Sequence, residues 1–282
     1  MDNQQQINLG ALPSPRDFRD IQLAKVQAPV PIPDEFIPDY LDKIPKLFQN
    51  GLGICSSCAG SYFKEIQEYL ESNQPQKFSP RYIWIKTKQI DGVPLEVGSY
   101  LRAVLKTLQS NGVCDYDLLP NQFPISLQDY SNPSVIIPEI DDNAQPRIIK
   151  SYAFLDDLSF DGLRQAIYQN KVVLARIVVD EGFFGTNEPT FTQKKWGHLV
   201  CLCGYTKDEI IILDSTEQDE KYAIKRIKKE YIEQGFLTEA GTGIDIDDEV
   251  VRQLIKKREL FQKLYELYRQ LLNLWKQLKP AK

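Results

Sequence analysis

The sequence predicts an α+β fold, in which a helical N-terminal half precedes a half rich in β-strands. Between residues 55 and 108, apolar residues recur at three- and four-residue spacing, which is typical of helices with one buried face. From residue 172 onward, short runs of consecutive apolar residues indicate buried strands. Proline and asparagine residues punctuate the stretch 120–146, and they predict a crossover between the two halves.

The chain begins with a proline-rich arm, residues 1–48. Residues 28–33 alternate proline with other residues, and proline removes a backbone donor and favours extended geometry before it. We therefore expect an extended arm that lies on the body of the protein. A sharper hypothesis is that residues 27–38 cover a cleft and restrain an activity there.

Three helices are expected in the N-terminal half. The first begins at Cys55, after glycines that permit a tight turn, and its apolar face continues to Leu70. The second begins at Ser79-Pro80, because proline suits the first helical turn. The third spans Tyr100–Leu108 and ends at Asn111-Gly112.

Strands are expected at Val172–Val179, His198–Cys203 and Ile210–Leu213, and the last two are joined by a hairpin loop, Gly204–Glu209. Because side chains alternate along a strand, one face of the second strand carries His198, Val200 and Leu202, and the other carries Leu199, Cys201 and Cys203.

A long amphipathic helix is expected near the C-terminus, from Val250 to Leu278. Its apolar residues alternate by four and three, as in a coiled-coil seam. Residues 250–282 hold nine basic residues against two acidic ones, so this end is locally cationic. We expect the seam to pack on the body or to self-associate; docking to a partner and lying on a membrane surface are the alternatives.

These observations predict a division of the chain into four parts. They are an extended arm (1–48), a helical subdomain (49–140), a β-rich subdomain (141–240) and the C-terminal amphipathic helix (245–280).

Composition excludes several classes of protein. The chain has 282 residues, of which 42% are hydrophobic and 26% are charged, as in ordinary globular proteins. No apolar run is long enough for a membrane helix, and the start lacks the features of a signal peptide, so we expect a cytoplasmic protein, with signal-free export as the alternative. The net charge of −5 argues against nucleic-acid binding. Five cysteines are an odd number and do not indicate a disulfide framework.

The chemistry centres on His198, the only histidine in the chain. Asp214 ends the strand after that of His198, so a hairpin brings the two residues close together. Cys55 begins a helix, where partial positive charge favours a thiolate. Gln49 lies six residues before Cys55 and can supply an amide donor. A thiol, a base, an orienting acid and an oxyanion donor are the groups that cysteine–histidine catalysis needs.

These residues resemble the motifs of the papain-like cysteine peptidases, in particular of divergent bacterial and phage-type members. The matching residues are Gln49, Gly53, Cys55 and Ala59 for the nucleophile motif, and His198, Gly204, Tyr205 and Asp214 for the histidine motif. The resemblance spans roughly residues 12–216. It implies a papain-like fold and hydrolysis of peptide bonds through a Cys55–His198–Asp214 triad and an acyl-thioenzyme. It further implies Gln49 at the oxyanion, a protein or peptide substrate, and no cofactor or metal.

Three departures from the family pattern bear on the site. Ser56 stands where the family has tryptophan, and Asp214 replaces the usual asparagine. The segment Asp214–Glu217 also lacks the tryptophan that shields the histidine pair in the family. A carboxylate beside the imidazole is expected to raise the pKa of His198.

Cys58 is the alternative nucleophile, although the spacing to Gln49 then fails. A second alternative is a zinc or iron–sulfur site, with Cys55, Cys58, Cys201 and Cys203 as ligands. Other functions remain open: a bacteriocin-processing peptidase that cleaves double-glycine leaders, an acyl transferase with the same triad, and a catalytically silent binding or structural protein.

Overall fold

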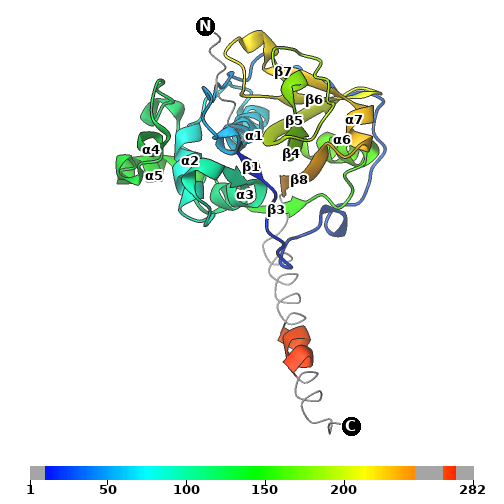
Figure 1. The fold of residues 1–282 in the computed structure, drawn as a ribbon, viewed down its shortest axis with the longest axis horizontal. Helices are drawn as coiled ribbons and strands as arrows, with labels where there is room; N and C mark the ends of the chain where they lie inside the picture. The colour runs from blue at the N-terminus through cyan, green and yellow to red at the C-terminus, as the bar shows by residue number, and fades with distance from the viewer. Residues whose placement is uncertain (1–9, 245–262, 271–282) are drawn as a thin grey trace.

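The computed structural model describes residues 10–244 and 263–270. A helical part and a part built around an antiparallel sheet lie side by side, and the N-terminal strand β1 (Ala11–Leu12) lies between them (Figure 1). The expected α+β architecture is confirmed. No helix among the described residues has the length and apolar character that a bilayer span requires.

The helical part is formed mainly by the chain between residues 55 and 144. In the described residues the α-helices are α1 (Cys55–Ser72), α2 (Pro80–Lys88), α3 (Leu101–Ser110), α4 (Leu127–Tyr130), α5 (Pro138–Ala144), α6 (Phe160–Asn170) and α7 (Lys229–Glu233), and residues 263–270 are helical as well. The expected helix starts at Cys55 and Pro80 are confirmed. Ser79 caps α2, since its side chain accepts a hydrogen bond from the Tyr82 N–H.

The main sheet has the strand order β3-β8-β4-β5-β6-β7, and all its neighbours are antiparallel. The strands are β3 (Ser151–Phe154), β4 (Val173–Val179), β5 (Trp196–Tyr205), β6 (Glu209–Leu213), β7 (Ile224–Lys228) and β8 (Leu237–Ile244). The three expected strands therefore exist as β4, β5 and β6. The hairpin between β5 and β6 is tighter than expected, because β5 continues through Tyr205.

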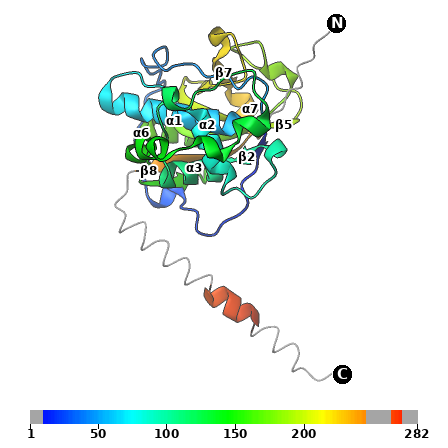
Figure 2. The same cartoon turned by 90° about the vertical axis from the view of Figure 1, so that its left-hand side faces the viewer.

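The two faces of the sheet belong to different hydrophobic cores. Leu199, Cys201 and Cys203 of β5 join the core shared with α1, whereas Val200 and Leu202 join the core shared with α6. Seen from the helical side, α1, α2 and α3 lie in front of the sheet (Figure 2). The expected alternation along β5 is confirmed, and it separates Cys201 and Cys203 from the face of Val200.

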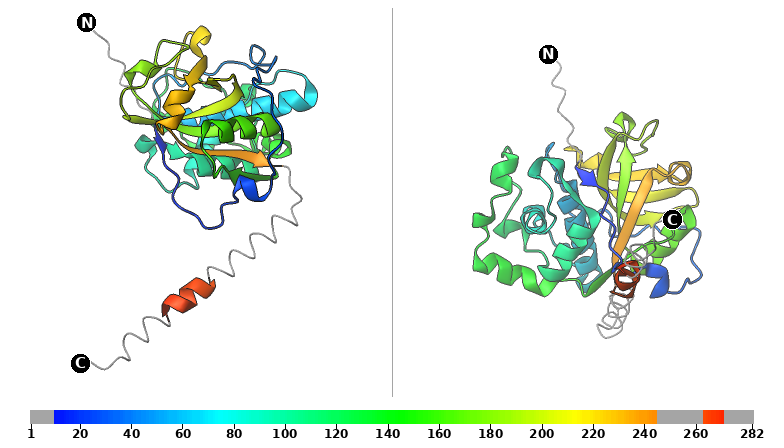
Figure 3. Two further views of the ribbon diagram at one scale, coloured as in Figure 1. Left: turned by 90° about the vertical axis from the view of Figure 1, so that its right-hand side faces the viewer. Right: turned by 60° about the horizontal axis from the view of Figure 1, so that its bottom comes forward.

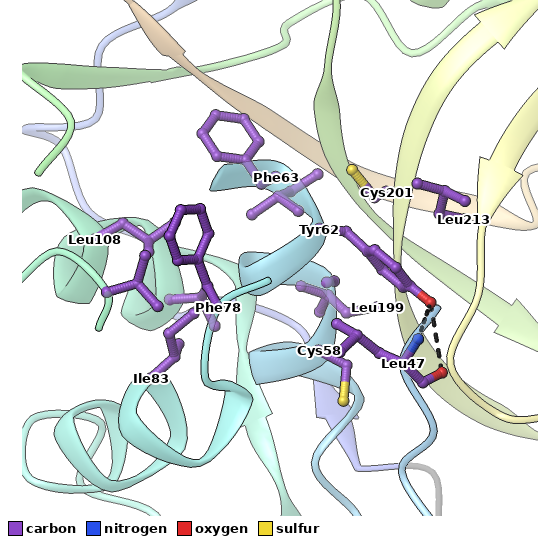
Figure 4. Close-up of a cluster of buried hydrophobic side chains, with 14 of the residues drawn as sticks. Leu47, Cys58, Tyr62, Phe63, Phe78, Ile83, Leu108, Leu199, Cys201 and Leu213 are labelled. Atoms are coloured by element: carbon purple, nitrogen blue, oxygen red, sulfur yellow. Dashed lines mark hydrogen bonds between the residues drawn. The ribbon is translucent and has the colours of Figure 1, made fainter. Parts of the chain in front are cut away.

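Tyr62 connects α1 to the chain on either side of it. Its hydroxyl accepts a hydrogen bond from the Leu47 N–H at 2.7 Å (Figure 4), and it lies 3.2 Å from the Asp214 carbonyl oxygen as a donor. Tyr62 is completely buried. One side chain of α1 thus holds both the segment before the helix, at Leu47, and the residue that follows β6, Asp214.

The N-terminal arm runs over the surface and then crosses the molecule. Strand β1 pairs in parallel with the short strand β2 (Ser99–Tyr100), and the arm can be followed from β1 around the sheet in Figure 3. Further along, Phe36 bridges to Tyr205 at the end of β5. The four-part division of the chain remains a prediction.

Most of the expected C-terminal helix lies outside the described residues, as do the ends of the 245–280 segment. In the part that is described, Leu264, Tyr265, Leu267 and Tyr268 are exposed. This part of the seam is therefore not packed on the body of the protein. Self-association and partner docking remain predictions.

Candidate active site

Cys55 is the first residue of α1 and is completely buried. The turn before the helix uses left-handed backbone at Asn50 and Gly51, with φ values of 49° and 72°. The residue before the helix, Ile54, provides no side-chain cap. The N–H groups of the first helical turn therefore receive no side-chain acceptor from Ile54. Their positive potential acts on the thiol of Cys55.

His198 and Asp214 form a buried hydrogen-bonded pair. The Nε2 atom of His198 lies 2.7 Å from Oδ1 of Asp214, and both side chains are inaccessible to solvent. Asp214 is held from two further sides: its N–H donates to the Ala223 carbonyl at 2.8 Å, and the Thr216 hydroxyl donates to Oδ2. The hairpin thus brings the histidine and the acid together as expected.

Cys55 and His198 form an electrostatically coupled pair. Burial alone would raise the pKa of Cys55, but the neighbouring His198 outweighs this effect and lowers that pKa. Burial would lower the pKa of His198, yet Asp214 and Cys55 raise it to about 9. The expected upward shift from Asp214 is present. Because the pKa of the thiol is lowered and that of the imidazole is raised, each group favours the charged form of the other, a thiolate beside an imidazolium.

Gln49 reaches the same site through Ser215. Its Oε1 accepts a hydrogen bond from the Ser215 hydroxyl at 2.9 Å, and its backbone N–H donates to the Ser215 carbonyl at 2.9 Å. Its Nε2 donates to the Leu52 carbonyl at 3.0 Å. Ser215 directly follows Asp214, so the side chains of Gln49 and Asp214 are fixed by one short segment.

Cys58 lies one turn further along α1, within the hydrophobic core (Figure 4). Burial raises its pKa well above that of an ordinary thiol, despite a hydrogen bond with Ser215. Cys55, by contrast, has an imidazole beside it and a lowered pKa. The electrostatics therefore favour Cys55 over Cys58 as the reactive thiol.

The four cysteines of the alternative metal site do not form a ligand cluster. Within residues 10–244 and 263–270, no group of three or more histidine, cysteine or acidic side chains is arranged to hold a metal ion. Burial raises the pKa of both Cys201 and Cys203, which opposes the thiolate form that a metal ligand needs. The structure gives the four-thiolate site no support.

The N-terminal strap, which we define as residues 10–20, covers Cys55. The backbone groups of Gly10 and Leu199 lie beside the Cys55 sulfur and contribute to the lowering of its pKa. The Gly10 carbonyl accepts from the Ser99 N–H at 2.8 Å, and the Ala11 carbonyl accepts from Arg176 Nε at 2.9 Å. The strap therefore occupies the space in which a ligand would approach the thiol.

The hypothesis that residues 27–38 cover the cleft is wrong. Arg164 of α6 donates to the carbonyls of Pro33 and Asp34, and Tyr205 donates to Pro33. These contacts hold the proline-rich segment against α6 and the far end of β5. The covering segment is the strap, which precedes the alternating prolines of residues 28–33.

Sequence reasoning missed two buried side chains beside the His198–Asp214 pair. The Phe183 ring contacts the His198 ring edge to face, with centroids 5.4 Å apart. Lys225 of β7 is completely buried, and its Nζ lies 3.8 Å from Oδ2 of Asp214. The only sign of Lys225 in the sequence was a lysine at an inward-facing position of a strand. That sign could not be recognised, because the strand β7 was not expected.

This architecture is the fold of the papain-like cysteine proteases. The chain is similar to the structure of xylellain, a cysteine protease from Xylella fastidiosa, with a TM-score of 0.71 and 18% identity, covering 88% of this chain and 99% of that one. It is also similar to digestive procathepsin L 3 of Tenebrio molitor, with a TM-score of 0.63 and 16% identity over 84% of this chain and 76% of that one.

A third similar structure is the bromelain protease from Ananas comosus in complex with the E64 inhibitor, with a TM-score of 0.58 and 14% identity, covering 75% of this chain and 99% of that one. No protein-family model matches the chain, and a search of curated proteins found no match. At these identities the likeness shows the fold, and the residues of this chain must carry any statement about its chemistry.

Proposed function

We propose that this protein is a cysteine endopeptidase. The observation that carries the proposal is the placement of the buried Cys55 thiol, at the N-terminus of α1 in a papain-like fold, beside His198, whose Nε2 pairs with Asp214 at 2.7 Å. The fold similarity supports the same activity class. The shifted pKa values of Cys55 and His198 support it independently, because they favour the nucleophilic thiolate.

In the proposed reaction, the Cys55 thiolate attacks the carbonyl carbon of the scissile peptide bond. His198 then protonates the leaving amine, and a water molecule hydrolyses the acyl-thioenzyme with His198 as base. Asp214 holds the imidazole in one orientation through the 2.7 Å hydrogen bond. The oxyanion is stabilised by the Cys55 N–H, which belongs to the first turn of α1, and by the Gln49 amide.

The strap implies that the described state is a closed one. Gly10 contacts the Cys55 sulfur, and neither Cys55 nor His198 is accessible to solvent. Substrate can reach the thiol only after the strap has left its place against β2. We therefore propose that removal or displacement of the strap precedes catalysis.

The test of the proposed activity is turnover of casein and of a blocked internal peptide, together with labelling by E64, which bromelain binds in its solved structure. Cys55→Ala is expected to abolish both turnover and labelling. Cys58→Ala is the matched control and should leave labelling intact. Labelling that survives in Cys55→Ala and disappears in Cys58→Ala would reverse the assignment.

The full burial of Cys55 and His198 also favours one second candidate, a catalytically silent binding protein on this scaffold. The discriminating measurement is the rate of Cys55 alkylation by iodoacetamide as a function of pH. A silent protein with an ordinary thiol would react with an apparent pKa of about 8.5. A thiolate–imidazolium pair would react well below that pH.

A further inference from the structure

Lys225 lies in the middle of the molecule without any access to solvent. Lysine is almost never fully buried unless it is paired, so its surroundings require an account. It belongs to β7, opposite Ile212 of β6, and Asp214 directly follows the last residue of β6, Leu213. Its position therefore places an ammonium group directly behind the His198–Asp214 pair.

Three segments converge on the Lys225 ammonium. It donates to the Thr186 carbonyl at 2.9 Å and pairs with Oε1 of Glu217 at 3.2 Å. Its distance to Oδ2 of Asp214 is 3.8 Å. It also lies over the Phe183 ring, 4.9 Å from the centroid. The loop after β4, the end of β6 and β7 thus meet at one charge.

The charge arrangement orients the Asp214 carboxylate. One oxygen, Oδ1, faces His198, whereas the other, Oδ2, faces the Thr216 hydroxyl and the Lys225 ammonium. Two cationic groups on opposite sides of one carboxylate hold its plane in place. The Lys225 charge is among the causes that lower the pKa of Asp214, after the opposing effect of burial and the stronger contribution of His198.

Phe183 completes the enclosure. Its ring contacts both the His198 ring and the Lys225 ammonium. The segment after Asp214 carries no tryptophan, so an aromatic ring from the loop after β4 covers the pair instead. This loop is fixed by Asp180, whose Oδ2 accepts from the Thr192 and Gln193 backbone N–H groups, each at 2.7 Å.

From these contacts we propose that Lys225 is a positioning residue, whose buried ammonium holds the Asp214 carboxylate in the orientation that binds His198 Nε2. Glu217 serves as the fixed counter-anion of the ammonium: its Oε1 also accepts from the Gly185 N–H at 2.6 Å. Lys225 affects catalysis only if His198 and Asp214 act as in the proposed function. The orientation of His198 itself can be measured without turnover.

The test uses the single histidine of the full-length chain. With ¹⁵N-labelled histidine, the ring gives one set of NMR signals, and the Nε2 proton reports the hydrogen bond to Asp214. Lys225→Met keeps the length of the side chain and removes the charge. It is expected to make this proton exchange with water at least about tenfold faster, because the carboxylate loses the cation that holds its Oδ2 side and no longer keeps Oδ1 aimed at Nε2. Lys228→Met, on the exposed end of the same strand, should leave the signal unchanged.

Two further variants separate the alternatives. Glu217→Gln alone should preserve the Nε2 proton, and Glu217→Gln combined with Lys225→Met should still lose it. Recovery of the signal in the double variant would overturn the proposal, because Lys225 would then only neutralise Glu217. A folded Lys225→Met protein with an unchanged signal would also overturn it.

If Lys225→Met does not fold, Lys225→Gln replaces it, because it retains a donor for Thr186 without the charge. An unchanged Nε2 signal in Lys225→Gln would overturn the proposal in the same way. Turnover that persists in Cys55→Ala would refute Cys55 as the nucleophile and leave this measurement valid.

Discussion

Deleting residues 2–16 removes the part of the strap that contacts Cys55, and it is expected to open the site. Besides a hydrogen bond from the Arg102 guanidinium to the Pro15 carbonyl, four hydrogen bonds anchor this part: Gly10 carbonyl to Ser99 N–H, Ala11 carbonyl to Arg176, Ser14 hydroxyl to the Arg102 N–H, and Ser14 N–H to Glu239. The donor–acceptor distances of these four run from 2.8 to 3.1 Å.

At about 1 kcal/mol net for each of these five bonds, the strap is held by about 5 kcal/mol, which corresponds to an open fraction of about one in several thousand. The rate of E64 labelling at Cys55 should therefore rise by about 10³ to 10⁴ on deletion. Arg176→Met removes one anchor and should raise the rate about fivefold to tenfold. The assay is mass-spectrometric labelling, with circular dichroism to verify folding.

Arg164→Met is the matched control for Arg176→Met. It removes hydrogen bonds of 3.0 and 3.1 Å to the carbonyls of Asp34 and Pro33, in the part of the arm that lies away from Cys55. Its labelling rate should equal that of the unchanged protein. The reasoning is refuted if the deletion leaves labelling unchanged, or if Arg164→Met accelerates labelling as much as Arg176→Met does.

Three other predictions follow from buried polar groups. Asp214→Asn removes the carboxylate that raises the pKa of His198, so the single histidine should titrate below about 9 in an NMR pH series; an unchanged midpoint would contradict the pairing. Burial raises the pKa of Glu65 from 4.5 to about 8, so the folded state retains a proton that the unfolded state has released. The free energy of unfolding should then fall as pH rises from about 5 to 8. Glu65→Gln should abolish most of that fall in urea titrations. An equal fall in both proteins would contradict the role of Glu65. Tyr62→Phe removes the hydrogen bonds to Leu47 and to the Asp214 carbonyl. It should lower the free energy of unfolding, measured in urea at pH 7, by about 1–3 kcal/mol. An unchanged free energy would show that these bonds do not stabilise the fold.

Local patterns in the sequence determined most of the secondary structure around the site. The periodicity after Cys55 predicted α1, because an amphipathic helix must present one apolar face every 3.6 residues. Apolar runs predicted β4, β5 and β6, and the order of β5 and β6 predicted that Asp214 meets His198. The single histidine also left only one candidate base. All of these features depend on neighbours along the chain or across one hairpin.

Only the tertiary structure decided what surrounds that base. The strap reaches Cys55 from more than forty positions earlier in the chain, and Lys225 reaches Asp214 from a strand that was not anticipated. Cys55 and Cys58 differ by one helical turn, so their sequence contexts are alike. The fold places an imidazole beside the first and apolar core around the second. Burial and partner charges set the pKa of each thiol, and they arise from long-range contacts that no local pattern encodes.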